Sequence, residues 1–464
     1  MDLESFRRAA HQTADWMADY LRDLGDRRVV SPVAPGDIRR QLPTDPPQDG
    51  EPFERIREDL DRIILPGMTH WGHPGFFGYF PANHSPPSIL AEMFVAAMGA
   101  QCMSWQTSPA ATELEQLVME WLRRMLGLPE GFTGVIQDYA STATLVALIT
   151  ARDQVRDALD RATVYVSPEA HSSVAKGARL AGFRPDLVRM VPVDDRYAMR
   201  PDALAAMIAE DRARGLVPAA VVVTLGTTSS TAFDPLPAIG PIAKDAGAWL
   251  HVDAAFAGSA AILPELAWIM AGIELADSLV FNPHKWLMVN HDCSVYFVRE
   301  PERLLQSFSA SAEYLKTQYD STVVNYRDWG VPLGRRFRAL KLWFVIRSYG
   351  VAGLQSLIRE HIRLGTLFAG WVATDSDFVL AAPAPVGLVC FRWAPRAGGL
   401  SGEELDHANR LLLDRINAPG DLFLTHTVLS GRFVIRLALG HESTTEALVR
   451  HVWDRVREAV PNPA

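Results

Sequence analysis

The sequence predicts an α/β protein built around a large, mostly parallel sheet, and two observations indicate it. Between about residues 85 and 350, short apolar runs alternate with longer Ala- and Leu-rich helical patterns. Such alternation favours parallel strands with helices on both faces. In addition, Asp253 and Lys285 each follow an apolar run. Ligands of such sheets bind at the carboxyl ends of the strands, so these two residues mark an expected site.

The expected elements follow in chain order. An amphipathic helix carries an apolar stripe from Phe6 to Leu24, a proline-rich connector spans 31–50, and a second helix places Phe53 and Ile64 on one face. Because these helices precede the main core, we expect their apolar faces to be buried against a partner subunit. In the central region, strands are expected at 163–167, 219–225, 249–254, 278–281 and 294–298, and helices at 142–151 and 201–214.

Near residue 350 the pattern changes to a helix and then to a small α+β lobe. Strands are expected at 378–381, 387–393 and 433–438, and a last helix from Thr444. A chain of 464 residues exceeds the size at which a single core keeps growing. We therefore expect an N-terminal helical dimerisation segment (1–84), a large cofactor-binding domain (85–352) and a small C-terminal domain (353–464).

Composition excludes several classes of protein. The net charge of −9, from 45 basic and 54 acidic residues, argues against nucleic acid or an anionic membrane as a partner. Cys102, Cys293 and Cys390 are far apart without a CxxC pair, so neither a disulfide framework nor a metal site is expected. No signal peptide and no run of ~18 apolar residues is present. These features predict a cytoplasmic protein.

The most informative motif is Asn282-Pro283-His284-Lys285-Trp286, taken with Asp253 at the end of an earlier strand. A lysine amine condenses with the aldehyde of pyridoxal phosphate, and a carboxylate pairs with the protonated pyridine nitrogen. A lone lysine is more often solvated, and a lone aspartate more often caps a helix. The apolar neighbours of Lys285 would lower its pKa, which favours the cofactor interpretation.

Other residues fit around such a cofactor. Strand alternation predicts that Ala255 lies on the same side as Asp253, against one face of the ring. Hydroxyl-bearing residues at 138–144 precede a helix, where an anion binds backbone donors, and 226–229 offers more donors. His171 follows another strand and could stack on the opposite ring face. A small core residue, an ordinary helix cap and a surface histidine are the alternatives for these three features.

Several separated strings resemble one family. They are Asn282-Pro283-His284-Lys285-Trp286, His251-Val252-Asp253-Ala254-Ala255, Ala170-His171-Ser172-Ser173, Tyr79-Phe80-Pro81 and Leu333-Gly334-Arg335-Arg336-Phe337. Together they resemble the aromatic-L-amino-acid decarboxylases, which are group II pyridoxal-phosphate decarboxylases. The resemblance implies the aspartate-aminotransferase fold (fold type I) with a seven-stranded sheet. It also implies an obligate homodimer with active sites at the subunit interface.

The resemblance also implies residue roles. Lys285 would bind the cofactor covalently, Asp253 would hold the pyridinium, and His171 would stack on the ring. Ala140, Ser141 and Asn282 would bind the phosphate, with Thr228 and His284 as supporting groups. Tyr326, which composition alone would place at the surface, would be the proton donor on a polar, lid-like segment (311–328). The substrate pocket would be formed by Trp71, Phe76, Phe77, Tyr79, Phe80, Pro81, Ala82, Gln101, Met103, His291 and Gly334.

The implied reaction is decarboxylation of an aromatic L-amino acid, of tryptophan, hydroxytryptophan, tyrosine or DOPA type, to an arylalkylamine. The main alternative is an aldehyde synthase on the same scaffold. Such relatives commonly replace the tyrosine or the stacking histidine, whereas Tyr326 and His171 are kept here. An aminotransferase and a non-catalytic dimer are further alternatives. Tyr139, Gln101 and His291 depart from many relatives, and Gly334 resembles the form that leaves room for an indole.

Overall fold

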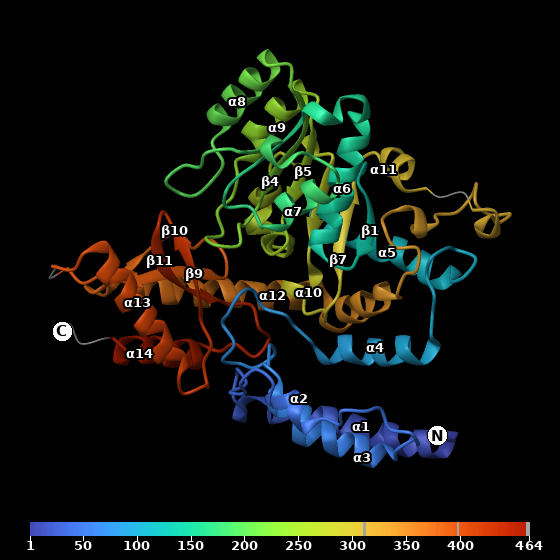
Figure 1. The fold of residues 1–464 in the computed structure, drawn as a ribbon, viewed down its shortest axis with the longest axis vertical. Helices are drawn as coiled ribbons and strands as arrows, with labels where there is room; N and C mark the ends of the chain where they lie inside the picture. The colour runs from blue at the N-terminus through green and yellow to red at the C-terminus, as the bar shows by residue number, and fades with distance from the viewer. Residues whose placement is uncertain (310–311, 397–398, 461–464) are drawn as a thin grey trace.

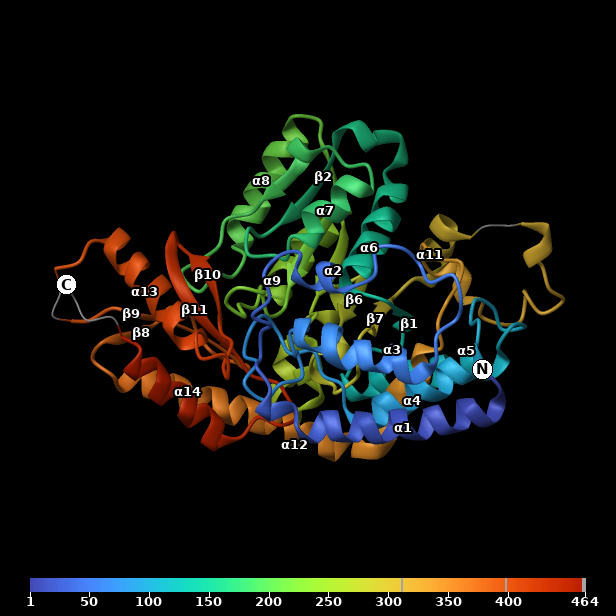
Figure 2. The same ribbon diagram turned by 60° about the horizontal axis from the view of Figure 1, so that its bottom comes forward.

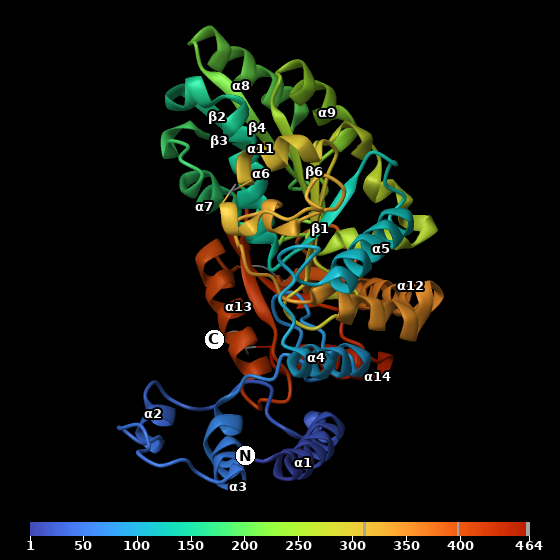
Figure 3. The ribbon, with the colours of Figure 1, turned by 90° about the vertical axis from the view of Figure 1, so that its right-hand side faces the viewer.

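The structure is a computed structural model that describes residues 1–309, 312–396 and 399–460. A large sheet with flanking helices forms the body, a smaller sheet with two helices lies beside it, and the N-terminal helices stand below (Figure 1). The view from the side separates these N-terminal helices from the body most clearly (Figure 3). Within the described ranges, no helix is long and apolar enough to cross a membrane.

The large sheet has seven strands, and the predicted α/β fold is confirmed. Their spatial order is β1 (Thr133–Gln137), β7 (Ser294–Val298), β6 (Ser278–Phe281), β5 (Trp249–Asp253), β4 (Val217–Thr224), β2 (Ala162–Val166) and β3 (Val188–Met190). Strands β6, β5, β4, β2 and β3 are parallel to one another, whereas β7 is antiparallel to both β6 and β1. The pattern did not reveal β1 and β3, which lie at the two edges.

Helices cover both faces of this sheet because the buried strands are apolar on both sides. On β4, Val221 and Val223 pack in one cluster with α5 (Pro109–Met125), α8 (Pro201–Ala213) and α9 (Leu236–Asp245). Ala220 and Val222 face the other cluster, with α6 (Ala140–Gln154), α7 (Ser173–Leu180) and α11 (Pro301–Phe308). Helix α6 begins at Ala140, earlier than predicted, so Ala140 and Ser141 lie in its first turn.

The small domain is an antiparallel sheet backed by helices. Its strand order is β10 (Thr425–Leu429), β11 (Arg432–Ala438), β9 (Leu388–Trp393) and β8 (Phe378–Leu380), with α13 (Gly402–Asn417) and α14 (Glu446–Glu458). Strand β10 was not predicted, because its residues alternate between half-buried and exposed positions and only Leu429 is buried. The long helix α12 (Arg338–Thr374) connects this domain to the body and breaks at Gly350, next to the predicted domain boundary.

The N-terminal segment has α1 (Leu3–Arg22), α2 (Asp37–Gln41) and α3 (Phe53–Asp59), followed by α4 (Pro86–Met98). Asp2 caps α1 by accepting a hydrogen bond from the Ser5 backbone amide. Helix α2 lies within the stretch that was predicted as a connector. Seen from below, α1 and α3 run side by side across the body (Figure 2). Ala9 is the only buried residue of α1, and Phe6 is 57% exposed.

The break in α12 predicts a glycine-specific position. Gly350 has φ 64° and ψ 166°, a conformation that is accessible almost only to glycine. We expect Gly350→Ala to destabilise the protein by about 1–3 kcal/mol. The control is Gly370→Ala in the same helix, where an added Cβ meets nothing within 4 Å. Chemical unfolding of both variants checks this, and equal midpoints would contradict it.

Candidate active site

The predicted cofactor residues lie together at the carboxyl edge of the parallel strands. They line a cavity of about 210 Å³. All of the residues predicted to bind the cofactor are in its wall, which comprises Phe80, Tyr139, Ala140, Ser141, His171, Ser173, Thr224, Gly226, Thr228, Asp253, Ala255, Phe256, Asn282, His284, Lys285 and His291. The site therefore collects side chains from segments that are up to two hundred residues apart.

Lys285 sits on a one-turn helix, α10 (Pro283–Trp286), rather than on the strand end that the pattern predicted. Pro283 starts this turn because its fixed φ suits the first position of a helix. The backbone carbonyl of Lys285 accepts a hydrogen bond from Asn83 Nδ2 at 2.5 Å. Burial lowers the pKa of Lys285 to about 8, with Asp253 opposing and Arg436 reinforcing the shift. The amine is therefore far easier to deprotonate than an ordinary lysine.

Asp253 is the last residue of β5 and is buried. One of its carboxylate oxygens accepts a hydrogen bond from the Ala255 backbone amide at 3.0 Å. Ala255 lies beyond the strand, so strand alternation was the wrong reason for pairing these two residues. This turn nevertheless brings both into the cavity wall, and Asp253 can meet the edge of a ring that lies against Ala255.

His171 lies between β2 and α7 and is anchored by its own turn. Its Nδ1 accepts a hydrogen bond from the Ser173 backbone amide at 3.2 Å and lies 2.7 Å from the Ser173 hydroxyl. Burial lowers the pKa of His171, Asp253 opposes the shift and Lys285 adds to it. The lowered pKa favours the neutral imidazole, and the contacts with Ser173 hold the ring in one orientation.

One end of the cavity presents donors for an anion. Helix α6 starts at Ala140, and no side chain caps its N-terminus. The first backbone amides of a helix bind anions when side chains leave them open. Nearby, the amide oxygen of Asn282 accepts a hydrogen bond from the Ser294 hydroxyl at 2.6 Å. That bond leaves the NH2 group of Asn282 as the donor available to a ligand.

Aromatic rings form the walls around these polar groups. His284 and His291 have ring centroids 4.2 Å apart, and Tyr139 lies 5.9 and 5.8 Å from them. Burial lowers the pKa of His284 to about 2, helped by His291 and Lys285. Phe80 stacks on Phe256 with a centroid separation of 4.0 Å. His284 therefore stays neutral, and Tyr139 contributes a further ring to this wall.

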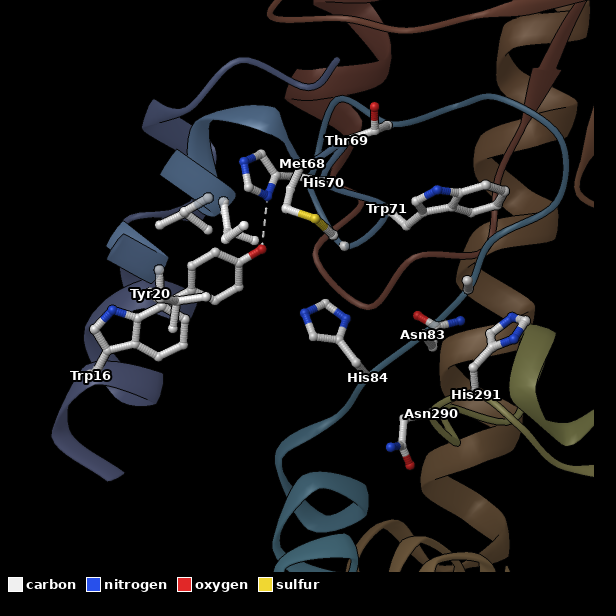
Figure 4. A pocket seen from close by; sticks show the side chains of 15 residues that line it. Trp16, Tyr20, Met68, Thr69, His70, Trp71, Asn83, His84, Asn290 and His291 are labelled. Carbon is white, nitrogen blue, oxygen red and sulfur yellow. Dashed lines mark hydrogen bonds between the residues drawn. The ribbon is translucent and has the colours of Figure 1, made fainter. Parts of the chain in front are cut away.

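The predicted substrate residues do not all meet at this cavity. Phe80 and His291 line the cofactor cavity. Trp71 and Ala82 line a larger apolar cavity of about 720 Å³ beside α1, and His291 lies in the walls of both cavities (Figure 4). Tyr79 is half exposed and stacks on Trp71. The remaining predicted residues lie outside both cavities. Phe76 and Phe77 are buried, and Pro81 packs near Gly440. Gln101 and Gly334 adjoin each other, and the Met103 carbonyl accepts a hydrogen bond from the Arg327 backbone amide.

Tyr326 departs most from expectation. It is buried rather than at the surface, and it lines a separate cavity of about 210 Å³ with Gly334 and Arg335. The Arg335 guanidinium lies over its ring at 4.7 Å, and Arg335 itself pairs with buried Glu115 at 2.7 Å. Burial raises the pKa of Tyr326 well above its ordinary value. Residue 311, the first of the predicted lid, lies outside the described residues.

Two residues at the site were missed from the sequence. Asn83 donates to the carbonyls of both Lys285 and Gly440, and therefore ties the one-turn helix to the small domain. Arg436 approaches from β11 and donates to the Thr228 carbonyl at 2.7 Å. The sequence did offer a signal for Arg436, because it is a charged residue at an inward position of an otherwise apolar strand. No local signal distinguished Asn83.

Comparisons with known proteins agree with this geometry. Residues 35–394 match the family model described as the pyridoxal-dependent decarboxylase conserved domain. The aromatic-L-amino-acid decarboxylase of Bos taurus is 43% identical, over 99% of this chain and 96% of its own length. The chain belongs to the pyridoxal-dependent decarboxylase family.

Further relatives are similar over nearly the whole chain. The phenylacetaldehyde synthase of Arabidopsis thaliana is 43% identical, over 99% of this chain and 96% of its own length. The crystal structure of Oryza sativa TDC with PLP and tryptamine is 38% identical and has a TM-score of 0.97, covering 99% of this chain and 98% of that one. The predicted family, carbon–carbon lyase class and cofactor, pyridoxal phosphate, are thereby confirmed.

The cavity of this decarboxylase fits pyridoxal phosphate. When bound, the cofactor supplies an aldehyde and a protonated ring that withdraws electrons from the substrate. Lys285 offers an amine with a lowered pKa, Asp253 offers a buried carboxylate, and α6 offers an uncapped helix N-terminus. These three groups match the aldehyde, the ring nitrogen and the phosphate of one small molecule.

The lowered pKa of Lys285 predicts a pH dependence for cofactor capture. Only the neutral amine attacks the aldehyde, so the capture rate should fall about tenfold per pH unit below ~8 and level off above it. Stopped-flow absorbance with cofactor-free protein measures this rate. Lys285→Ala is the control and should show no covalent capture. A midpoint near ~10.4, the ordinary lysine value, would contradict the assignment.

Proposed function

We propose that this chain decarboxylates an aromatic L-amino acid, of tryptophan, hydroxytryptophan, tyrosine or DOPA type, to the arylalkylamine and CO2. The observation that carries the proposal is the joint placement of Lys285, Asp253 and His171 in one cavity of a pyridoxal-dependent decarboxylase. The full-length similarity to an aromatic-L-amino-acid decarboxylase supports the aromatic substrate class.

In this proposal each residue acts at a defined atom. Bound pyridoxal phosphate would supply the electron-withdrawing ring that loss of CO2 requires. Asp253 would hold the proton on its ring nitrogen. His171 would pack its imidazole against the ring face opposite Ala255. Lys285 would hold the cofactor aldehyde between turnovers. The first turn of α6 and the NH2 group of Asn282 would bind the phosphate.

Tyr326 supplies the proton that completes the amine product. In the described chain its hydroxyl lies 3.5 Å from the Gly134 carbonyl, in the cavity with Gly334. That cavity is separate from the one that contains Lys285. We infer that the segment carrying Tyr326 completes the active site of a second subunit. The same reasoning accounts for Gly334 and Gln101, which lie beside Tyr326 rather than beside Lys285.

A homodimer is supported by uncovered apolar surface. Monomeric proteins rarely expose large contiguous apolar patches. Here α1, α3 and α4 expose a series of large apolar side chains, namely Leu3, Phe6, Ile56, Leu90, Phe94 and Met98. The apolar cavity of about 720 Å³ is lined in part by α1 and by the residues that follow α3 (Figure 4). We propose that a second copy of the chain covers these faces.

The three cysteines are all buried and unpaired. Free thiols of this kind suit a reducing compartment, so we propose that the dimer works in the cytoplasm.

The substrate ring is proposed to be indolic or phenolic. Gly334 leaves space that a side chain would fill, because a Cβ there would lie 3.1 Å from Gln101 Nε2. The Gln101 oxygen already accepts a hydrogen bond from the Arg335 backbone amide at 2.8 Å. Its NH2 group is therefore the end left to meet a polar ring substituent. His291, with its pKa lowered by burial, offers a neutral imidazole to the same substrate class.

An aldehyde synthase is the alternative, since a phenylacetaldehyde synthase is 43% identical. The presence of Tyr326 and His171 favours simple decarboxylation to the amine product over aldehyde formation.

Product analysis tests the proposed reaction. We expect the purified protein with pyridoxal phosphate to release CO2 and amine, in equal amounts, from indolic and phenolic L-amino acids. Tyr326→Phe should shift the product towards aldehyde with ammonia and peroxide, because the α-carbon is then not protonated and dissolved O2 oxidises it, with water supplying the aldehyde oxygen. Lys285→Ala should lose activity by about 10³-fold or more, as for loss of a covalent catalytic group.

Amine, aldehyde and CO2 are measured together for each variant. Turnover of phenylalanine alone would contradict the substrate class, and full amine production by Tyr326→Phe would contradict the proton donor.

Sharing of sites between subunits has its own test. Lys285→Ala and Tyr326→Ala chains carry complementary defects if Tyr326 acts on the partner's site. Co-expression should then restore amine production, because a mixed dimer contains one site with both residues intact. About half of the chains pair as mixed dimers at equal expression, and each has one intact site of two, so roughly a quarter of wild-type activity is expected. Activity no higher than that of the separate variants would show that Tyr326 acts within its own chain.

A further inference from the structure

Arg436 is a buried charged residue that the proposed mechanism leaves unused. It lies on β11 of the small domain and is 4% exposed. Its guanidinium donates to three different segments: to the Thr228 carbonyl at 2.7 Å, to the Tyr79 carbonyl at 3.2 Å and to the Thr425 hydroxyl at 3.2 Å. One side chain therefore joins the large domain, the N-terminal segment and the small sheet.

The loop that carries Thr228 is held by the small sheet at further points. The Cys390 thiol donates to the Ser229 carbonyl at 3.1 Å, and the Thr427 hydroxyl donates to the Ser229 hydroxyl at 2.9 Å. Thr228 lines the cofactor cavity, whereas Ser229 does not. Strands β9, β10 and β11 thus clamp the outer side of a loop whose inner side faces the cofactor.

The charge of Arg436 is also unusual. A second buried arginine of the same sheet, Arg392, pairs with Asp406 at 3.1 Å. Arg436 forms no ion pair with any carboxylate of the described residues. Its guanidinium lies 5.5 Å from the Phe80 ring centroid, and the Lys285 amine lies 5.1 Å from the same centroid. A buried cation without a counter-ion repels a proton on a nearby amine.

We propose that Arg436 is a positioning residue for the cofactor site, which fastens the Thr228 loop to the small domain and places an uncompensated positive charge near Lys285. The inference rests on the proposed placement of the cofactor beside Lys285. It makes the small domain part of the cofactor site, since β11 determines both the position of Thr228 and the charge that the lysine experiences.

The two parts of this role can be separated by substitution. Arg436→Met removes both the hydrogen bonds and the charge. Arg436→Lys keeps the charge and loses the planar fork that reaches three acceptors. Thr427→Val removes one clamp contact and leaves the charge unchanged. Arg392→Lys is the matched control, because it alters a buried arginine of the same sheet that does not touch the loop.

Three properties are measured for each variant. They are the dissociation constant of pyridoxal phosphate by tryptophan fluorescence, the pH midpoint of cofactor capture by Lys285, and the thermal midpoint without cofactor. Only the third reports general stability. None of them requires catalytic turnover.

We expect Arg436→Met to weaken cofactor binding by about 10–100-fold, as for loss of charge-assisted hydrogen bonds, and to raise the pH midpoint towards that of an ordinary lysine. Arg436→Lys and Thr427→Val should weaken binding and leave the pH midpoint in place. Arg392→Lys should change neither. The proposal is overturned if both Arg436 variants match Arg392→Lys in cofactor binding and pH midpoint, whatever their thermal midpoints.

Failure of the inference is distinguishable from failure of the proposed site. Borohydride reduction of the wild-type protein with cofactor should add the cofactor mass to the peptide containing Lys285. Absence of that adduct overturns the site and the role of Arg436 with it. An adduct on Lys285, combined with unaltered Arg436 variants, overturns the role of Arg436 alone.

Discussion

The active site depends on the parallel alignment of β4, β5 and β6. Their register places Thr224 beside Asp253 and Asp253 beside Val280, so all three strands reach the same edge together. The carboxylate at the end of β5 and the one-turn helix after β6 then meet across one small cavity. A shift of one residue in any of these pairings would turn Asp253 towards a helix-covered face, where its charge would have no counterpart.

Burial then gives these groups their chemistry. A lysine in water is protonated at neutral pH and does not attack an aldehyde, whereas desolvation lowers the pKa of Lys285 to about 8. The same desolvation lowers the pKa values of His171 and His284, which favours their neutral rings over cations. The positive charge that remains near the lysine belongs to Arg436, whose polar contacts are backbone carbonyls and a hydroxyl.

Tyr326, the proposed proton donor, and Lys285 line separate cavities. If Tyr326 acts on a partner's site, its hydroxyl cannot protonate an intermediate until that site is assembled. The guanidinium of Arg335, which pairs with buried Glu115, packs on the Tyr326 ring. Assembly with a second chain would therefore control the fate of the intermediate as well as cover the apolar helices.

The sequence by itself determined the residues whose roles follow from local pattern. Apolar runs marked the central strands, and Lys285 and Asp253 were recognised because they end such runs with the chemistry of a pyridoxal site. Strands β1, β3 and β10 were not predicted from the sequence, because edge strands and half-exposed strands contain few apolar residues in a row. Only the tertiary structure decided the burial of Tyr326, the division of the substrate residues between cavities, and the contacts of Asn83 and Arg436. Those features join segments that lie hundreds of residues apart, and local propensity carries no information about which distant segments will pack together.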